Sequence, residues 1–523
     1  MKSLAKHRAV YVFLLFLACI VFSCNNSPSE IFRPNILFIP VDDLRPDLGC
    51  YGNTSILSPN IDRLAADGLT FTRSYCQQAV CNPSRASLLT GLRPDSIQVW
   101  DLRTHFRDNV PDVITLPQFF KQNGYTCIGL GKAFHNNDPD TISWSETPQN
   151  IEGFPFDPDA VYLNEENLNL QDAKKHRMIA AGRNRIDQLG HWYVKAKATE
   201  LADVDDDAYY DGAQTTVAIS ILNDLAKEKK PFFLSVGYYR PHLPFNAPGK
   251  YWNLYDRTSL PLAHNQFTPV GSPAFAMHGD QELRSYDDCH DLPWPGEEPW
   301  DEARQRELLH GYYASVSYTD AQVGRLLDEL DRLGIRENTI VVLWGDHGWK
   351  LGEHNGWCKQ TNYEIDTRVP MIFSGYGVEA KAKKSRALTE FVDIYPTLCE
   401  MAGLPIPGHL QGSSLVPLLS DPDKTWKKAA FSQFLLGRFG PPETREQERM
   451  GYAIRTDQYR YVEWYAWDKE LKKPGILLAS ELFDHETDPN ENMNLANDSS
   501  YEQIKDALSL QLKQGWRYAL PEE

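Results

Sequence analysis

The sequence has little of three things: positive charge, closely spaced cysteines and long apolar runs. Its 53 Lys and Arg residues face 71 Asp and Glu residues, which gives a formal net charge of −18. This balance argues against a nucleic-acid-binding protein, which would show a basic footprint. It also means that an anionic substrate must be attracted by a local basic pocket and not by the overall field of the protein.

The nine cysteines include no CxxC pair and no dense cluster. Two of them lie in the N-terminal segment, and Cys81 has a distinctive setting described below. Because connectivity cannot be deduced from such spacings, we predict no disulfide framework. The remaining six are Cys50, Cys76, Cys127, Cys289, Cys358 and Cys399.

Only the N-terminus carries an extended apolar run. Residues 9–22 follow three basic residues, and their length is typical of a signal peptide and short for a membrane span. The run closes in VFSC at 21–24, which resembles a bacterial lipobox. We therefore predict a lipoprotein signal peptide at 1–24, with Cys24 carrying a lipid anchor. The protein would then be an exported bacterial lipoprotein of the periplasm or cell surface, with ordinary secretion as the alternative.

Four apolar, β-rich runs each end directly in polar residues that can carry chemistry. Such runs are typical of strands that are buried on both faces of a parallel sheet. They cover residues 36–39, 125–128, 232–236 and 340–343. Amphipathic helical patterns alternate with them, at residues 60–68, 116–124, 211–229 and 320–333. This alternation predicts an α/β sandwich with a large, mostly parallel sheet flanked by helices.

Two long segments, 140–195 and 251–300, interrupt this pattern and are predicted to be irregular insertions. Long insertions in compact domains are often functional, so we expect them to shape the substrate pocket; exposed decoration is the alternative. Near the C-terminus, a hairpin is predicted at 452–464 and a helix at 501–516. The predicted organisation is a catalytic domain at 25–436 and a smaller α+β subdomain at 437–523.

The polar residues that follow the four strands are expected to meet at one edge of the sheet. Ligands of open α/β sheets bind beyond the carboxyl ends of the strands. Asp42 and Asp43 follow the first strand, and Asp346 and His347 follow the fourth. Three carboxylates and one imidazole favour Ca²⁺, with Mg²⁺ second, and do not require a transition metal. Singly, each pair is equally consistent with a helix cap, a turn or a loop hydrogen bond; together they favour a metal site.

Residues 81–91, CNPSRASLLTG, place Cys81 at a predicted helix start, four residues before Arg85. Pro83 is well suited to a first helical turn. The positive end of a helix favours anions, and we expect it to lower the pKa of the Cys81 thiol. A buried structural cysteine is the alternative. Two cations and two histidines elsewhere could neutralise an oxyanion and act as acid or base: Lys132, His135, His242 and Lys359.

Residues 81–91 resemble the signature of the type I sulfatase family. The similarity extends over nearly the whole mature chain and is greatest to the iduronate-2-sulfatase branch, which shares the Asp346-His347 pair where many sulfatases have Asp-Asn. Leu92 departs from the signature, which usually has Arg there, and this could alter recognition by the maturation enzyme. The other matching segments are VDDLRP at 41–46, GCYG at 49–52, SPNID at 58–62, QQAVC at 77–81, GKAFH at 131–135, PHLPF at 241–245 and DHGWKLGEH at 346–354.

The resemblance implies an alkaline-phosphatase-like fold and a hydrolase of sulfate esters. A formylglycine-generating enzyme would oxidise Cys81, and the hydrated aldehyde would attack sulfur. The implied metal ligands are Asp42, Asp43, Cys81, Asp346 and His347. The other implied catalytic residues are Arg85 for the diol, Lys132 and His135 for sulfate elimination, and His242 and Lys359 for sulfate binding and protonation of the leaving oxygen.

The substrate implied by the resemblance is a sulfated saccharide, most specifically the 2-O-sulfate of a uronic acid. Four residues are further candidates for the substrate pocket, although packing or surface roles are equally consistent: Trp100, Asp101, Arg103 and Trp349. One alternative is a phosphonate or phosphate monoester hydrolase of the same superfamily. Another is a non-catalytic glycan-binding lipoprotein with an unmodified Cys81.

Overall fold

The computed structural model describes residues 33–135, 139–146, 151–155, 158, 161–186, 190–228, 230–437 and 447–522. The predicted signal peptide and Cys24 lie outside these residues. The chain from Pro34 onward forms one compact unit. None of the helices within the described ranges is both long enough and apolar enough to cross a membrane.

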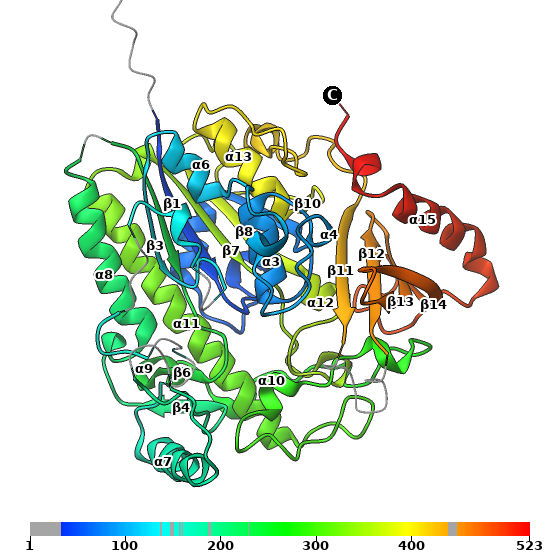
Figure 1. Ribbon diagram of the computed structural model, residues 1–523, viewed down its shortest axis with the longest axis horizontal. Helices are drawn as coiled ribbons and strands as arrows, with labels where there is room; N and C mark the ends of the chain where they lie inside the picture. Colours follow the sequence, from blue (N-terminus) through cyan, green and yellow to red (C-terminus); the bar gives the residue numbers. More distant parts are fainter. Residues whose placement is uncertain are drawn as a thin grey trace, which may run out of the picture. The chain divides into compact units, whose positions relative to one another are not determined.

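A mixed sheet of eight strands forms the centre of the protein (Figure 1). The strands are β1 (Asn35–Val41), β2 (Gly68–Tyr75), β3 (Thr126–Gly131), β5 (Phe232–Gly237), β7 (Thr339–Gly345), β8 (Arg368–Gly375), β9 (Lys383–Ser385) and β10 (Thr389–Glu390). Their order is β10-β2-β8-β7-β1-β5-β3, and β9 pairs with β2. β8 runs antiparallel to β2 and β7, whereas β1 pairs in parallel with β5 and β7. The prediction of a large, mostly parallel sheet is confirmed.

Strand β1 shows why the sheet is apolar on both faces. Ile36 and Phe38 lie in a core with residues of one helical layer, and Leu37 and Ile39 lie in a second core on the opposite face. The first layer contains α3 (Cys81–Thr90), α6 (Leu116–Gln122), α13 (Ile394–Met401) and α14 (Val416–Ser420). The second contains α2 (Pro59–Ala66), α8 (Tyr210–Leu225) and α11 (Glu302–Arg332). Alternating side chains of one strand thus fill two cores, which requires a continuous apolar run.

Two predictions about helices are wrong. The pattern at 320–333 is only the C-terminal part of α11, which begins at Glu302 and is capped by Asp301 through the backbone N–H of Arg304. The insertion at 140–195, predicted to be irregular, contains α7 (Glu165–Ala180). Asn167 is the one residue of α7 that is fully buried, so this helix has no apolar face from which a periodicity could be recognised.

Shorter elements connect the layers. β4 and β6 form a separate parallel pair. The insertion at 251–300 is mostly irregular, in agreement with the prediction, and carries the one-turn helix α10 (Gln281–Arg284). The remaining short elements are α4 (Pro94–Ile97), α5 (Phe106–Asn109), β4 (Thr199–Ala202), β6 (Phe245–Pro248), α9 (Gly249–Trp252) and α12 (Glu364–Thr367).

A second, antiparallel sheet lies near the C-terminus. Its strands are β11 (Ala430–Leu436), β12 (Arg449–Arg455), β13 (Tyr459–Asp468) and β14 (Lys473–Asp484). β12 and β13 form the predicted hairpin, and β11 precedes residue 437, where the subdomain was predicted to begin. The helix α15 (Glu502–Gln514) covers one face, with Leu508 among Ile454 and Leu482. On the other face, Phe434 and Trp464 share a core with Val80, next to the start of α3.

Candidate active site

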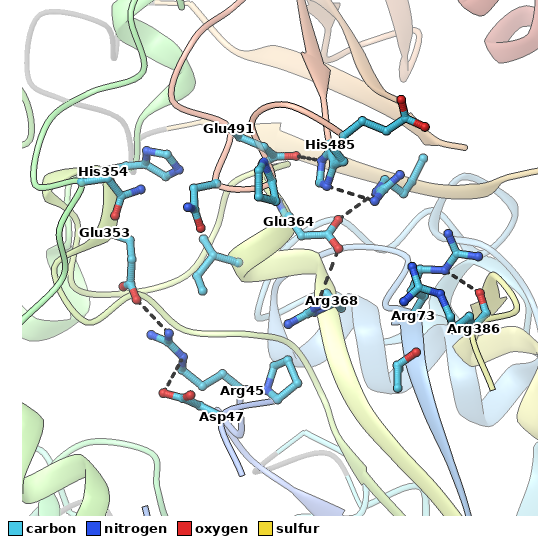
Figure 2. A pocket seen from close by; sticks show the side chains of 18 of the residues that line it. Arg45, Asp47, Arg73, Glu353, His354, Glu364, Arg368, Arg386, His485 and Glu491 are labelled. Carbon is cyan, nitrogen blue, oxygen red and sulfur yellow. Dashed lines mark hydrogen bonds and ion pairs between the residues drawn. The ribbon is translucent and has the colours of Figure 1, made fainter. Parts of the chain in front are cut away.

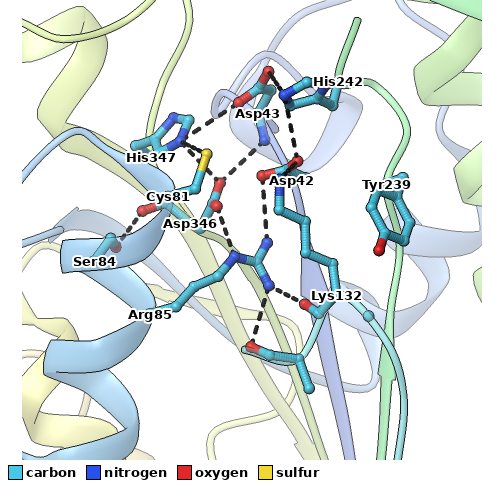
Figure 3. Close-up of polar contacts among 12 residues, drawn as sticks. Asp42, Asp43, Cys81, Ser84, Arg85, Lys132, Tyr239, His242, Asp346 and His347 are labelled. Atoms are coloured by element: carbon cyan, nitrogen blue, oxygen red, sulfur yellow. Dashed lines mark hydrogen bonds and ion pairs between the residues drawn. The ribbon is translucent and has the colours of Figure 1, made fainter. Parts of the chain in front are cut away.

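The loops after β1, β3, β5 and β7 meet at the start of α3 (Figure 3). Backbone hydrogen bonds continue the sheet into these loops and fix them against one another. The N–H of Asp42 donates to the carbonyl of Tyr238 at 3.1 Å, and the N–H of Asp346 donates to Val41 at 3.1 Å. The N–H of Lys132 donates to Gly237 at 3.0 Å. The structure therefore brings together polar residues that lie far apart in the sequence.

Cys81 is the first residue of α3 and is 2% exposed. Its Sγ lies 3.2 Å from Nε2 of His347. Burial, together with the charge of Asp42, raises the pKa of the thiol well above its usual value. The expectation that the helix start lowers this pKa is therefore wrong, because the cost of burying a thiolate exceeds the effect of the helix.

Four side chains can direct ligand atoms to one point: Asp42, Asp43, Cys81 and His347. These atoms lie within 4.8 Å of one another, and all four residues are buried. Asp43 adopts a φ of 55°, a left-handed conformation that Asp tolerates better than most residues. Its Oδ2 is buried and accepts no hydrogen bond from the described residues. Burial raises the pKa of Asp43, although Lys359 opposes this effect.

His347 and Asp346 complete this donor set. Nδ1 of His347 lies 3.0 Å from the carbonyl of Gly348, and since a carbonyl only accepts, Nδ1 carries a proton. In the neutral ring Nε2 then offers its lone pair, which is the form that binds metals. Oδ1 of Asp346 lies 3.4 Å from this Nε2 and accepts the N–H of Asp43 at 3.1 Å. Buried carboxylates, one of them with an oxygen that accepts no hydrogen bond from the described residues, fit a hard divalent cation.

Arg85 and Lys132 supply positive charge on the other side of the carboxylates. Nε of the fully buried Arg85 donates to Oδ2 of Asp346 at 2.9 Å, and its Nη2 lies 3.5 Å from Oδ1 of Asp42. Nζ of Lys132 forms an ion pair with Oδ2 of Asp42. Burial opposes ionisation of Asp42, but Lys132, His242 and Arg85 together hold its pKa well below the usual value. Asp42 is therefore a carboxylate in spite of its burial.

His242 and Lys359 face the cluster from the side of Asp43. Nε2 of His242 lies 3.9 Å from a carboxylate oxygen of Asp42 and of Asp43. Nζ of Lys359 lies 2.8 Å from Oδ1 of Asp43. Both nitrogens also contact the carboxylate of Glu282, at 2.7 Å from His242 and 2.9 Å from Lys359. The sequence offered no signal for Glu282, which lies in a one-turn helix of an irregular insertion.

The other predicted site residues differ in how deeply they are buried. His135 is partly buried, and its pKa is held well below the usual value by burial and by Lys132. Trp349 is fully buried, and its ring centroid lies 5.0 Å from Nζ of Lys359, so its ring packs against that side chain. Trp100, Asp101 and Arg103 lie in a partly exposed loop, which the amide of Asn82 holds to the start of α3 by donating to the carbonyl of Asp101 at 2.9 Å.

A separate cavity of about 540 Å³ lies between the loop after β1 and the C-terminal sheet (Figure 2). Its charged side chains form pairs within the wall. Arg45 contacts Glu353 at 2.7 Å, Arg455 contacts Glu364 at 3.1 Å, and His485 contacts Glu491 at 2.9 Å. This mixed charge contrasts with the cluster around Cys81, where the donor atoms converge on one point.

Comparison with known proteins identifies the family. The sulfatase family model matches residues 34–404, and the model of the N-sulphoglucosamine sulphohydrolase C-terminal region matches residues 352–517. Iduronate 2-sulfatase from Mus musculus is 33% identical, with 89% of this chain and 91% of that protein covered. A sulfatase from Formosa agariphila is 30% identical, with 95% and 90% covered.

Solved structures show the same fold. The protein BT4656, in complex with D-glucosamine-2-N,6-O-disulfate, superposes with a TM-score of 0.65 at 22% identity, covering 92% of this chain and 99% of that one. A phosphonate monoester hydrolase from Agrobacterium radiobacter gives a TM-score of 0.67 at 23% identity, covering 92% and 95%. The central sheet with its flanking helices and the small C-terminal sheet are thus alkaline-phosphatase-like. The chain belongs to the sulfatase family and is a hydrolase of sulfate esters.

Proposed function

We propose that this enzyme removes the 2-O-sulfate from a uronic acid of a sulfated saccharide, by means of a formylglycine derived from Cys81. The observation that supports the chemistry is the grouping of Cys81 with three further metal-competent side chains, next to the cationic groups of Arg85, Lys132 and Lys359 and the imidazole of His242. The support for the substrate is the 33% identity to iduronate 2-sulfatases of mouse and human over 89% of the chain. A sulfate ester needs a nucleophile, neutralisation of its charge and an acid for the leaving oxygen, and the cluster contains candidates for each.

The donor set fits Ca²⁺, with Mg²⁺ as the less favoured ion. Asp42, Asp43, Asp346, His347 and the modified residue 81 would hold it. When bound, such an ion polarises the sulfate oxygens and favours ionisation of a hydroxyl nucleophile. The fit rests on the buried Oδ2 of Asp43, which accepts no hydrogen bond from the described residues, and on the tautomer of His347.

The chain's own residues take complementary roles in this proposal. Arg85 and Lys132 neutralise the carboxylates and the oxygens at residue 81. Arg85 lies on α3 with residue 81, and Lys132 follows β3 and pairs with Asp42. His135, held neutral, accepts a proton when sulfate is expelled and the aldehyde is restored. His242 and Lys359 bind the sulfate, and the one nearer the bridging oxygen donates the proton that the departing sugar hydroxyl requires. The loop with Trp100, Asp101 and Arg103 lies near the start of α3, where it can contact the saccharide.

A panel of defined sulfated disaccharides tests the substrate. Mature enzyme is expected to release sulfate from the 2-O position of a uronic acid and to leave glucosamine N- and 6-O-sulfates intact. Release from a glucosamine position only would overturn the proposed substrate and leave the sulfatase activity in place. Exo or endo action is tested separately, with sulfated tetrasaccharides that carry the sulfated uronic acid either at the chain end or at an internal position.

Hydrolysis of phosphonate or phosphate monoesters is a second candidate, favoured by the fold match to phosphonate monoester hydrolases at TM-scores of 0.67 and 0.68. Matched aryl sulfate and aryl phosphonate esters separate the two. A higher kcat/KM for the phosphonate would favour this second candidate. A protein that binds glycans but hydrolyses neither ester would be a non-catalytic glycan-binding lipoprotein.

We also propose that the enzyme is exported and anchored through a lipid on Cys24. The Cys24→Ala variant is then expected to move from the membrane fraction to the soluble periplasmic or culture fraction, because the proposed acyl anchor is lost. Fractionation followed by immunoblotting measures this shift. An unchanged distribution, with the wild type already soluble, would indicate ordinary secretion.

A further inference from the structure

Glu282 lies between the two groups that the proposed function assigns to the sulfate. One carboxylate oxygen is 2.7 Å from Nε2 of His242, and the other is 2.9 Å from Nζ of Lys359. Its ligand atom also lies within 4.8 Å of that of Asp43. A carboxylate offers the same anionic acceptors as a sulfate ester, so Glu282 occupies positions that an anionic substrate requires.

His242 cannot serve both anions through Nε2. Its Nδ1 lies 2.6 Å from the carbonyl of Leu243, which accepts only, so Nδ1 donates there. The ring then has a single further N–H, at Nε2, and the carboxylate of Glu282 lies at hydrogen-bond distance from it. A sulfate oxygen that binds Nε2 must therefore replace Glu282 at that N–H.

Lys359 adds an electrostatic conflict. Its ammonium group already contacts Oδ1 of Asp43 at 2.8 Å in addition to Glu282. Lys359 is 2% exposed, so the charges around it are weakly screened. A sulfate ester and Glu282 on the same ammonium group would repel each other, which also favours displacement of the carboxylate.

The displacement needs only a side-chain rotation. Neighbouring residues anchor the backbone of α10, since Leu283 is 1% exposed and Nε of Arg284 donates to the carbonyl of Gly279 at 3.0 Å. The guanidinium of Arg284 also lies 3.8 Å from the ring centroid of Trp294. The side chain of Glu282 itself is 21% exposed and can turn toward solvent.

We propose that Glu282 is a built-in competitor for the sulfate position and thereby a specificity-determining residue. It weakens the binding of free sulfate and of small sulfate esters. A substrate that gains further contacts through its saccharide displaces the Glu282 carboxylate. This inference rests on the proposed function, which assigns His242 and Lys359 to the sulfate. Binding energy from the saccharide is then used to displace Glu282, which favours long substrates over short ones and limits inhibition by the sulfate product.

Two substitutions test this inference. Glu282→Gln keeps the size but removes the charge, and Glu282→Ala removes the competing group altogether. Glu298→Gln, an exposed position in the same insertion, is the matched control. Calorimetric titration of the mature, metal-loaded enzyme with sodium sulfate is expected to give a Kd about tenfold or more lower in both Glu282 variants, because a charge-assisted hydrogen bond no longer competes. The kcat/KM for a small aryl sulfate is expected to rise relative to that for a sulfated disaccharide.

Lys359→Ala separates the possible failures, with circular dichroism and thermal melting as checks of folding. Sulfate binding that is unchanged or weaker in both Glu282 variants, but lost in Lys359→Ala, would overturn the competitor role: Glu282 would then hold His242 and Lys359 in place. The sulfate position itself would stand. Sulfate binding that does not depend on Lys359 would overturn both this inference and the assignment of the sulfate position.

Discussion

At the scale of single residues, burial decides the state of the reactive groups. The helix start at Cys81 is correctly predicted from the sequence, but the thiol's pKa moves upward because Cys81 is 2% exposed and lies close to Asp42. A buried, protonated thiol is a poor nucleophile. An unmodified Cys81 is thus unsuited to attack a sulfate ester, which is consistent with the proposed conversion to formylglycine.

Removal of the Cys81 side chain is expected to abolish turnover without unfolding the protein. In Cys81→Ala, sulfate release from the best disaccharide should fall about a thousandfold or more, because no other group supplies the nucleophile. Discontinuous sulfate assays measure the loss, and thermal melting checks the fold. Substantial residual turnover would contradict the nucleophile assignment. Mass spectrometry of the peptide that contains residue 81 gives an independent check: active wild-type enzyme carrying only the thiol would refute the modification.

At the scale of elements, the C-terminal sheet holds the loop that carries Lys359. Arg460 on β13 is 1% exposed and donates to the carbonyl of Asn362 at 3.0 Å. It also pairs with Glu364 at 2.5 Å and with Glu491 at 2.6 Å. Figure 2 shows these two carboxylates from their cavity side. The antiparallel sheet is therefore connected to the loop that carries Lys359 by an ionic network around the buried Arg460.

Breaking this network is expected to be costly. Arg460→Ala removes the cation that the buried Glu491 shares with the partly buried Glu364, and we expect the free energy of unfolding to fall by about 3–5 kcal/mol. Urea titration measures the change. Lys469→Ala is the control in the turn that follows β13, since its side chain is 68% exposed and surface pairs contribute little. Equal stability of the two variants would contradict the proposed role of Arg460.

The strands of the central sheet and the short helix α10 differ in how far the sequence predicts them. Strands β1, β3, β5 and β7 are continuous apolar runs and were predicted within a few residues. The sequence does not predict β2 and β8, which lie between β7 and the edge strand β10. Glu282 could not be predicted, because only tertiary packing brings α10 to His242. Its one-turn helix has no periodicity and matches no motif.

At the scale of the whole molecule, Glu390 joins three parts of the fold. It lies on β10 of the central sheet and accepts two hydrogen bonds from Arg93, both at 2.8 Å. Arg93 is the residue just before α4. Lys427 contacts it at 2.7 Å, and the N–H of Phe431 on β11 donates to it at 2.9 Å. This one carboxylate therefore holds the central sheet, the segment after α3 and the C-terminal sheet together.

Its ionisation makes the assembly sensitive to acid. Burial opposes ionisation, but Arg93 and Lys427 lower the pKa of Glu390 from 4.5 to about 2. Because the folded pKa lies below the unfolded one, the stability contributed by Glu390 is fully present above about pH 5 and is lost as the pH falls toward 2. Glu390→Gln should therefore unfold with about 3–5 kcal/mol less free energy near neutral pH, since the buried Arg93 loses its carboxylate partner and Lys427 keeps only Asp393. Urea titrations of both proteins at several pH values should show this difference shrinking below about pH 5. Titrating groups that do not interact with Glu390 are common to the two proteins and cancel, whereas Asp393, which shares Lys427 with Glu390, titrates in the same cluster. A difference that stayed constant down to about pH 3 would show that this cluster is not the acid-sensitive link.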